Sequence, residues 1–389
     1  MSDLSTTLQA LERTRSQLPV SSYFDAALFE REKALLFDSG PRYVGHALQV
    51  PQPGRYQTLA HEGEGRALIH TPDGIELVSN VCRHRQAVML KGAGDLGSGP
   101  SEPRIVCPLH RWTYSAQGQL LAAPHFDTQP CLNLQRYPLD NIGGLLFERN
   151  GCDVRGDLGP LLQHPAFSFD GYVLDRVEQH RCPYNWKTFI EVYLEDYHVG
   201  PFHPGLGHFV TCDDLAWQLL PNASLQTVGL HRSLVQPGSA VYTRWHDQVL
   251  AAQSAGLPLL GPQPAPGLPD IGAVWLTYYP HIMLEWYPGT LVVSTLHPIG
   301  PRETLNTVAF FYPEEIAAFE REFVEAQQAA YMETCIEDDE IAERMDAGRQ
   351  ALFERGDDEA GPYQQPMERG MEHFHQWYRR RLWPQQHSA

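Results

Sequence analysis

Three side chains in residues 185–204 have the types and spacing of a metal site: Glu195, His198 and His203. Glu195 and His198 are three residues apart, so on a helix they would share one face, whereas His203 follows five residues later. The intervening Gly200-Pro201 can bend the backbone until both imidazoles face one point. Two histidines converging beside acidic residues indicate a metal site. A buried helix with hydrogen-bonded histidines is the alternative for this segment taken alone.

Two Cys/His pairs upstream form a second candidate metal motif. They are Cys82-Arg83-His84 and Cys107-Pro108-Leu109-His110. A structural zinc site is the competitor, but zinc knuckles usually keep cysteine with cysteine and histidine with histidine. In a Rieske [2Fe-2S] centre one iron takes both thiolates and the other takes both imidazoles. Mixed pairs on two loops therefore favour an iron–sulfur cluster over zinc.

With both motifs in this order, the chain resembles the Rieske-type non-haem iron oxygenases, the α subunits of ring-hydroxylating dioxygenases and monooxygenases. The resemblance covers nearly the whole chain. It is carried by Pro41–Pro53, Cys82-x-His84-Arg85, Cys107-Pro-x-His110-x-Trp112, Asn185-Trp186-Lys187 and Glu195-x-x-His198 with His203. The resemblance implies a [2Fe-2S] cluster bound by Cys82, His84, Cys107 and His110, and a mononuclear Fe(II) bound in part by His198 and His203.

The same resemblance implies a carboxylate as the third iron ligand. The segment from Glu337 to Glu343 is similar to a stretch of the choline, betaine and carnitine branch in which the aspartate binds iron, and this selects Asp338. Asp339 is the rival, and a solvated helix face is the alternative for all these acids. Two histidines and one carboxylate leave coordination positions open for O2.

A residue in the position of Glu195 links the two metal sites in the family. The resemblance therefore implies that Glu195 accepts hydrogen bonds from His198 and from His110 of the partner subunit, which holds both ring N–H groups. Electron transfer across a subunit boundary predicts a ring, most simply a homotrimer.

The function that the resemblance implies is that of a terminal oxygenase. It would use O2 and electrons from an NAD(P)H-dependent flavin or iron–sulfur reductase, directly or through a ferredoxin. The substrate would be a small aromatic or quaternary-ammonium compound, hydroxylated by mono- or dioxygenation or oxidatively demethylated. The alternative is a Rieske electron carrier whose large domain binds a ligand without oxygenating it. Such a carrier would have no need for His198, His203 and Asp338.

Several residues near the motifs carry further expectations. Gln86 and Arg111 stand where glycine is common after the two cluster histidines of the family. Trp112 is expected either to cover the cluster or to be an ordinary buried tryptophan. The interval after Arg85 is longer than usual, and we assign the excess to an exposed loop at Gly92–Pro103.

The aromatic residues of the second half are candidates for the walls of a substrate pocket. They are Trp217, Trp245, Trp275, Tyr278, Trp286 and Tyr287. An aromatic cage would hold a trimethylammonium group by cation–π attraction, whereas ordinary core packing is the more frequent role of aromatic residues in sheets.

The elements that must position these residues indicate an α+β chain of two domains with an N-terminal extension. Residues 1–38 show helical periodicity and are expected to pack on the catalytic domain as two helices split by Pro19. Residues 39–155 contain short apolar runs broken by proline and glycine, typical of a small all-β domain, here the Rieske domain. Residues 156–389 would form the catalytic domain with the mononuclear iron.

Four apolar runs in the catalytic domain predict strands of an antiparallel sheet: Gly272–Tyr279, His281–Tyr287, Thr290–His297 and Asn306–Tyr312. A long helical pattern follows from Pro313, beginning in glutamate-rich sequence that suits a helix N-terminus. The resemblance implies that this half is a helix-grip (START-like) sheet with a cavity beneath the long helix.

Composition limits the partners and the compartment. Lys+Arg of 29 against Asp+Glu of 47 gives a net charge of -18, which opposes binding to nucleic acid or to anionic membranes. The seven cysteines are odd in number and scattered, which indicates reduced thiols. We expect neither a signal peptide nor a membrane span, and we predict a cytoplasmic protein.

Overall fold

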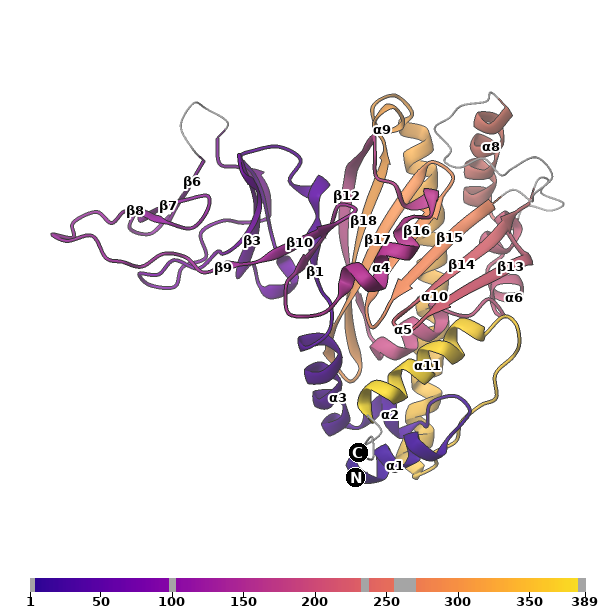
Figure 1. Ribbon diagram of the computed structural model, residues 1–389. Helices are drawn as coiled ribbons and strands as arrows, with labels where there is room; N and C mark the ends of the chain where they lie inside the picture. The colour runs from indigo at the N-terminus through magenta and orange to yellow at the C-terminus, as the bar shows by residue number, and fades with distance from the viewer. Residues whose placement is uncertain (1–3, 98–102, 232–237, 255–270, 384–389) are drawn as a thin grey trace. The chain divides into compact units, whose positions relative to one another are not determined.

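The computed structural model describes residues 4–97, 103–231, 238–254 and 271–383 (Figure 1). The chain divides into two compact units, one made of Met1–Ser39 with Val154–Ala389 and the other of Gly40–Asp153. The first unit combines helices with a large antiparallel sheet, and the second consists of small antiparallel sheets. The α+β fold expected from the sequence, with a small all-β domain, is therefore confirmed. No helix in the described part of the chain is both long and apolar enough to cross a membrane.

The all-β unit, Gly40–Asp153, contains three small antiparallel sheets. The first has the order β1 (Arg42–His46), β11 (Leu145–Glu148), β10 (Leu139–Ile142). The second has the order β5 (Ala93–Asp95), β2 (Arg55–Thr58), β3 (Arg66–Thr71), β4 (Gly74–Ser79), β9 (Arg136–Tyr137). The third has the order β6 (Arg104–Val106), β7 (Thr113–Ser115), β8 (Leu120–Ala122). Short 3-10 helices lie at Ala47–Gln49 and Ala60–Glu62.

The segment Gly92–Pro103 is only in part the loop expected from the sequence. Ala93–Asp95 forms strand β5, which pairs with β2 in the register Tyr56 to Gly94. Residues 98–102 lie outside the described part of the chain. The polar, glycine-containing composition concealed the strand, because a short edge strand carries little apolar alternation.

The larger unit is built on one seven-stranded antiparallel sheet. Its order is β12 (Tyr172–Cys182), β18 (Glu303–Pro313), β17 (Thr290–Gly300), β16 (Ile282–Tyr287), β15 (Ile271–Tyr278), β14 (Ala223–Leu230), β13 (Val210–Leu220). The four strands predicted from apolar runs are β15 to β18, and the hairpin turn between β16 and β17 is Pro288-Gly289. Strands β12, β13 and β14 were not predicted from the sequence. In β12 and β13 one face is exposed and polar, which weakens the apolar signal.

A long helix runs behind this sheet in the view of Figure 1. The predicted helix after Pro313 is divided at Glu320 into α9 (Glu314–Phe319) and α10 (Arg321–Arg355). The other helices described after the all-β unit are α4 (Val154–Leu162), α5 (Trp186–Tyr193), α6 (Val199–Phe202), α7 (Leu206–Phe209), α8 (Ala240–Ser254) and α11 (Arg369–Leu382), with a 3-10 turn at Pro165–Phe167. Buried side chains of α8, α10 and the inner strands form one apolar core.

The N-terminal segment forms more pieces than the two predicted helices. They are α1 (Leu4–Arg13), α2 (Ser21–Phe24), α3 (Ala26–Glu32) and a π-helix at Lys33–Asp38. The split between α2 and α3 has a local cause, because the side chain of Asp25 caps α3 by accepting from the backbone N–H of Ala27 and Leu28. Leu8 and Leu28 pack in one apolar cluster with Trp186 of α5 and Phe374 of α11.

A buried ion pair joins α3 to α5. Lys187 Nζ lies 2.7 Å from Glu32 Oε1, and both side chains are almost completely buried. Trp186 Nε1 donates to the other carboxylate oxygen at 2.9 Å, and Tyr378 of α11 also donates to Glu32. Trp186 and Lys187 of the Asn185-Trp186-Lys187 motif therefore hold the N-terminal helix α3 against α5.

Lys187→Met is expected to lower the free energy of unfolding by about 3–5 kcal/mol, because it leaves the buried carboxylate of Glu32 without its counter-ion. Urea denaturation followed by tryptophan fluorescence measures the change. Lys33→Met is the control, since the Lys33–Glu30 pair is exposed and such pairs contribute about 0–1 kcal/mol. Equal losses in the two variants would contradict this account of the buried pair.

Candidate functional site

The first candidate motif lies in a turn between two helices and not on one continuous helix. Helix α5 ends at Tyr193, two residues before Glu195, and α6 spans only Val199–Phe202. His198 is the N-terminal cap and His203 the C-terminal cap of α6. The break expected at Gly200-Pro201 is therefore wrong, because these residues lie inside α6. The single helical turn still brings its two flanking imidazoles to one side.

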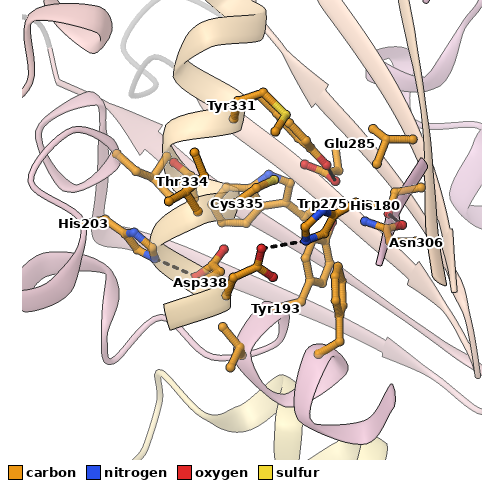
Figure 2. Close-up of a pocket in the computed structure, with 18 of the residues that line it drawn as sticks. His180, Tyr193, His203, Trp275, Glu285, Asn306, Tyr331, Thr334, Cys335 and Asp338 are labelled. Atoms are coloured by element: carbon orange, nitrogen blue, oxygen red, sulfur yellow. Dashed lines mark hydrogen bonds and ion pairs between the residues drawn. The ribbon is translucent and has the colours of Figure 1, made fainter. Parts of the chain in front are cut away.

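Both imidazoles and one carboxylate face a common point. His198 Nε2 and His203 Nε2 are 2.9 Å apart, and Asp338 Oδ1 of α10 lies 3.4 Å from the first and 3.0 Å from the second. Figure 2 shows His203 directed towards Asp338. The three residues have donor atoms close enough to one another to share a metal ion. Residues about 140 positions apart in the sequence thus form one donor set.

A glutamate lies beside the Nδ1 atom of each imidazole, the ring nitrogen that faces away from the shared point. Glu195 Oε1 lies 2.6 Å from His198 Nδ1, and Glu337 Oε2 lies 2.7 Å from His203 Nδ1. Glu337 forms a hydrogen bond that fixes the Nδ1–H tautomer of His203 and directs its Nε2 lone pair to the shared point, as in carboxylate–histidine–metal arrangements. Glu195 lies within ion-pair distance of His198 Nδ1 and accepts from the backbone N–H of His198 at 3.1 Å. Glu337 is not among the site residues predicted from the sequence. Its place directly before Asp338 was the available signal.

The electrostatics of the donor set favour a cation. Burial lowers the pKa of His198, but hydrogen bonds to Asp338 and Glu195 outweigh it and raise the value to about 10. Burial raises the pKa of the Asp338 carboxyl, but the hydrogen bonds to His198 and His203 outweigh that and lower it. A metal ion would replace the protons that these groups attract. Two imidazoles and one carboxylate beside a cavity fit Fe(II) with open coordination positions.

Asp339, the rival for the third carboxylate, faces away from this point. Tyr184 donates to Asp339 Oδ1 at 2.6 Å, and His180 Nε2 lies 2.6 Å from Asp339 Oδ2. This hydrogen bond raises the pKa of His180 to about 10. The structure therefore brings Asp338, and not Asp339, to the two histidines.

A cavity of about 190 Å³ borders the donor set. Of the six aromatic candidates, Trp245, Trp275 and Tyr287 line the cavity. Tyr278 and Trp286 belong to the opposite face of the sheet, because side chains alternate along β15 and β16. Trp217 lies against Gly370 instead.

The two Cys/His loops share one backbone design. The Cys82 N–H donates to Ala87 O at 2.9 Å, and the Gln86 N–H donates to Cys82 O at 3.0 Å. The second loop repeats this pattern in full. The Cys107 N–H donates to Trp112 O at 2.8 Å, and the Arg111 N–H donates to Cys107 O at 3.1 Å. Each loop therefore presents one thiol and one imidazole from the same tight turn.

The two histidines of these loops lie together, and so do the two cysteines. The rings of His84 and His110 have centroids 4.6 Å apart. Burial, and then the adjacent thiol of Cys82, raise the pKa of Cys107, so metal binding must displace a proton there. His84 Nδ1 is buried without a hydrogen-bond partner in the described part of the chain. A buried imidazole nitrogen without a partner among the described residues, on a loop that also carries a thiol, fits a cluster ligand.

Trp112 is buried and packs against His84. It is 2% exposed, and its ring stacks on His84 with centroids 5.1 Å apart and planes inclined by 7°. Phe126 meets the edge of Trp112 at 5.3 Å. The two roles considered for Trp112 are therefore not exclusive, since a buried tryptophan also covers one imidazole.

The two departures from the family's glycines fall at strained backbone positions. Gln86 has φ of 53° and Arg111 has φ of 63°. This left-handed conformation costs an L-residue about 1–2 kcal/mol and suits glycine. Both loops therefore keep the backbone shape that glycine would adopt more easily.

Arg111→Gly is expected to stabilise the all-β unit by about 1 kcal/mol, because it relieves the strain of a positive φ. The temperature at which heating abolishes the cluster's visible absorption measures this gain. Arg104→Gly, at an exposed strand position, is the control and should lower that temperature. A lower temperature for Arg111→Gly as well would mean that its side chain contributes more than the strain costs.

Comparison with protein families gives two matches on this chain. Residues 169–383 match the family described as the ring hydroxylating alpha subunit, catalytic domain, and residues 41–138 match the Rieske [2Fe-2S] domain. A protein named putrescine 2-hydroxylase from Ralstonia nicotianae is 60% identical over 380 residues, covering 98% of this chain and 99% of the relative. A protein of the same name from Bordetella bronchiseptica is also 60% identical, over 94% of this chain and 84% of the relative.

More distant proteins share the fold. A quaternary ammonium Rieske monooxygenase crystallised with L-carnitine superposes with a TM-score of 0.73 at 20% identity, over 97% of this chain and 99% of that one. A naphthalene 1,2-dioxygenase from Rhodococcus sp. superposes with a TM-score of 0.71 at 16% identity, over 98% of this chain and 99% of that one. The chain therefore belongs to the Rieske ring-hydroxylating oxygenase family, as a catalytic subunit with a Rieske [2Fe-2S] cluster and a mononuclear iron.

Proposed function

We propose that this chain monooxygenates a short aliphatic diamine and hydroxylates putrescine at carbon 2. The relatives that are 60% identical over nearly all of the chain carry that activity in their names. The observation that carries the proposal is the approach of Asp338 Oδ1 to His203 and His198, at 3.0 Å and 3.4 Å, beside a cavity of about 190 Å³.

The residues that would hold the metals are those identified in the sequence. His198, His203 and Asp338 would bind the mononuclear iron. Cys82, His84, Cys107 and His110 would bind the cluster, within a Rieske domain at 39–155 that precedes a catalytic domain at 156–389. When bound, the cluster supplies single electrons and the Fe(II) activates O2.

The protein's own groups orient the ligands and exclude water. Glu195 and Glu337 hold the Nδ1 atoms of the two histidines, so that both Nε2 atoms stay directed at one point. Trp245, Trp275 and Tyr287 provide apolar walls around the substrate carbon. In the overall reaction one C–H bond becomes C–OH, the second oxygen atom leaves as water, and NAD(P)H supplies the two electrons.

Glu195 would also connect the two centres across subunits in a homotrimer. Its contact with His198 supplies one half of that link. His110 of the same chain is exposed and is thus accessible to Glu195 of a neighbouring copy. An NAD(P)H-dependent flavin or iron–sulfur reductase, acting directly or through a ferredoxin, would reduce the cluster. This supply of NAD(P)H, with seven cysteines that form no disulfide, supports a cytoplasmic location.

The proposed substrate is a primary diamine, whereas the sequence resemblance implied an aromatic or quaternary-ammonium compound. A diamine shares its positive charge with the quaternary-ammonium expectation but not with the aromatic one. The alternative of a Rieske electron carrier without oxygenation gains no support, because the complete donor set of His198, His203 and Asp338 would have no purpose in it.

Product analysis tests the proposal. The iron-loaded protein is incubated with a reductase, NADH, isotopically labelled O2 and putrescine, and in parallel with choline, carnitine or naphthalene. We expect 2-hydroxyputrescine that contains one labelled oxygen atom, and no product when the reductase is omitted. Oxygenation of one of the other compounds, with putrescine left unchanged, would overturn the substrate assignment.

A further inference from the structure

Glu285 differs from most other buried carboxylates of the molecule in having no counter-ion. Glu32 pairs with Lys187, and Glu191 pairs with Arg349 at 2.6 Å. Glu285, in the middle of β16, is only 2% exposed, yet within the described ranges no lysine, arginine or histidine forms an ion pair with it. A buried carboxylate without a cation is unfavourable, so its presence calls for a partner.

Neutral hydroxyl groups hold the Glu285 carboxylate in place. Tyr287 donates to Oε2 at 2.7 Å, and Tyr331 of α10 donates to Oε1 at 3.1 Å. Trp275 Nε1 in turn donates to the Tyr287 hydroxyl at 3.0 Å. These bonds fix the orientation of the carboxylate but bring no positive charge, and they leave acceptor lone pairs on both oxygens.

The carboxylate lines the same cavity as the candidate iron ligands, at a distance from them. Tyr331 and Asp338 lie on the same side of α10, seven residues or about 10 Å apart along the helix axis. Figure 2 shows Glu285 near Tyr331, away from His203 and Asp338. Trp275, the cross-strand neighbour of Glu285, also borders this space. A small linear molecule can therefore have one end at Glu285 and its chain towards Asp338.

We propose that Glu285 binds an ammonium group of the substrate and thereby sets which carbon faces the mononuclear iron site. An ammonium has three N–H donors for the free lone pairs of the carboxylate, and the aromatic rings of Trp275 and Tyr287 add cation–π attraction. This inference rests on the proposed function for the identity of the amine. The inference goes beyond the proposed function because it assigns the selection of the substrate to Glu285.

The pKa of the Glu285 carboxyl makes binding of such a cation dependent on pH. Burial raises the pKa of its carboxyl from 4.5 to about 7, the hydrogen bonds from Tyr287 and Tyr331 oppose this rise, and the charge of Asp338 adds to it. Since the carboxylate form is required, ammonium binding should strengthen as the pH rises through about 7, while the amine stays protonated. The titratable groups around Glu285 are Tyr287 of β16, Tyr193 of α5, and Tyr331, Cys335 and Asp338 of α10. Tyr242 of α8 lies beyond them, next to Tyr287.

Glu285→Gln separates a binding role from a structural one. Glutamine keeps the shape and hydrogen-bonding capacity of the protonated acid, so folding should be preserved. The raised pKa means that the wild type loses folding stability as the pH rises from 4.5 through 7, and a neutral side chain avoids this loss. We therefore expect thermal stability above pH 7 to be equal or higher in the variant, with unchanged iron and cluster content.

Calorimetry with the metal-loaded protein measures binding directly. Removing one partner of a buried charge pair should weaken putrescine binding by roughly 30-fold or more and abolish the pH dependence near 7. Glu178→Gln is the matched control. Glu178 also borders the cavity, but Arg176 already neutralises it, so binding should not change.

Asp196→Asn tests the other buried cavity carboxylate that has no ion pair within the described ranges. It receives a hydrogen bond from Gln226.

Glu285→Asp distinguishes substrate binding from a purely structural role, because only a binding residue would change the preference between diamines of different length. Shortening the side chain by one methylene moves the carboxylate away from the iron site. The preference between putrescine and the longer diamine cadaverine should then shift towards cadaverine, both in affinity and in the position of hydroxylation. An unchanged ratio between the two diamines would contradict the assignment of chain-length selection to Glu285.

The possible outcomes distinguish this inference from the proposed function. If the wild type binds putrescine and Glu285→Gln binds it equally well, or if only Asp196→Asn loses it, the role of Glu285 is wrong and the proposed function stands. If the wild type instead binds choline, carnitine or cadaverine, and Glu285→Gln loses that cation, the role stands and putrescine is the wrong substrate. Binding of neutral 1,4-butanediol or naphthalene, with no ammonium compound bound, would overturn both.

Discussion

Asp338→Ala is expected to remove the mononuclear iron and abolish oxygenation while the [2Fe-2S] cluster stays in place. The variant takes away the carboxylate that lies 3.0 Å from His203 Nε2 and 3.4 Å from His198 Nε2. Loss of an outer carboxylate typically costs about 10- to 100-fold in metal affinity or activity, and we expect a direct ligand to cost more. Iron and sulfide analysis per protomer, with EPR of the reduced cluster, measures both sites.

Asp339→Asn is the control for this prediction. Asp339 is the next residue on α10, but its carboxylate contacts Tyr184 and His180 instead of the two histidines of the donor set. We expect Asp339→Asn to keep the mononuclear iron. Loss of iron in Asp339→Asn, together with full retention in Asp338→Ala, would show that the other carboxylate is the ligand.

Glu195→Gln is expected to slow electron delivery to the mononuclear iron by roughly 100-fold with both metals still bound. The carboxylate lies 2.6 Å from His198 Nδ1, and in the proposed trimer it also accepts from His110 of the partner subunit. A neutral amide cannot accept from both ring N–H groups equally well. Rapid mixing of the reduced protein with O2 and substrate, followed by the cluster's absorption, measures the rate.

Glu337→Gln gives the matched comparison for Glu195. Glu337 makes the same kind of contact to the other imidazole, His203, but has no proposed role between subunits. We expect Glu337→Gln to weaken iron retention, with reoxidation of the cluster per iron-loaded site close to the wild-type rate. Normal turnover in Glu195→Gln would show that electrons do not pass through this residue.

The candidate metal motifs stand out in the sequence because their donor atoms come from unusual residue combinations at short spacing. Cys82 with His84, and Cys107 with His110, needed no knowledge of the fold to be grouped. Asp338 was harder, since one residue decides whether a helical side chain faces the histidines or turns away. The family resemblance selected it, and the contacts of Asp339 with Tyr184 and His180 show why its neighbour is excluded.

The cavity could not be predicted from the sequence in the same way. Its walls depend on the face of each strand, and a shift of one position moves a side chain to the opposite side of the sheet. Trp286 lies next to Glu285 in the sequence, yet only Glu285 lines the cavity. A single acidic residue inside the apolar run His281–Tyr287 was the available signal for Glu285. The break between Tyr193 and His198 was concealed because Gly200-Pro201 offered a more obvious place for it.

A single-turnover experiment tests whether electrons stored in the cluster and in Fe(II) oxygenate putrescine. The protein, loaded with both metals, is reduced without oxygen, separated from reductant, and mixed with O2 and putrescine. Each protomer then holds one electron in the cluster and one in Fe(II), which together suffice for one monooxygenation. We expect hydroxylated product close to one per mononuclear iron, formed as the EPR signal of the reduced cluster disappears. Full oxidation of the cluster with iron bound and substrate unchanged would contradict it.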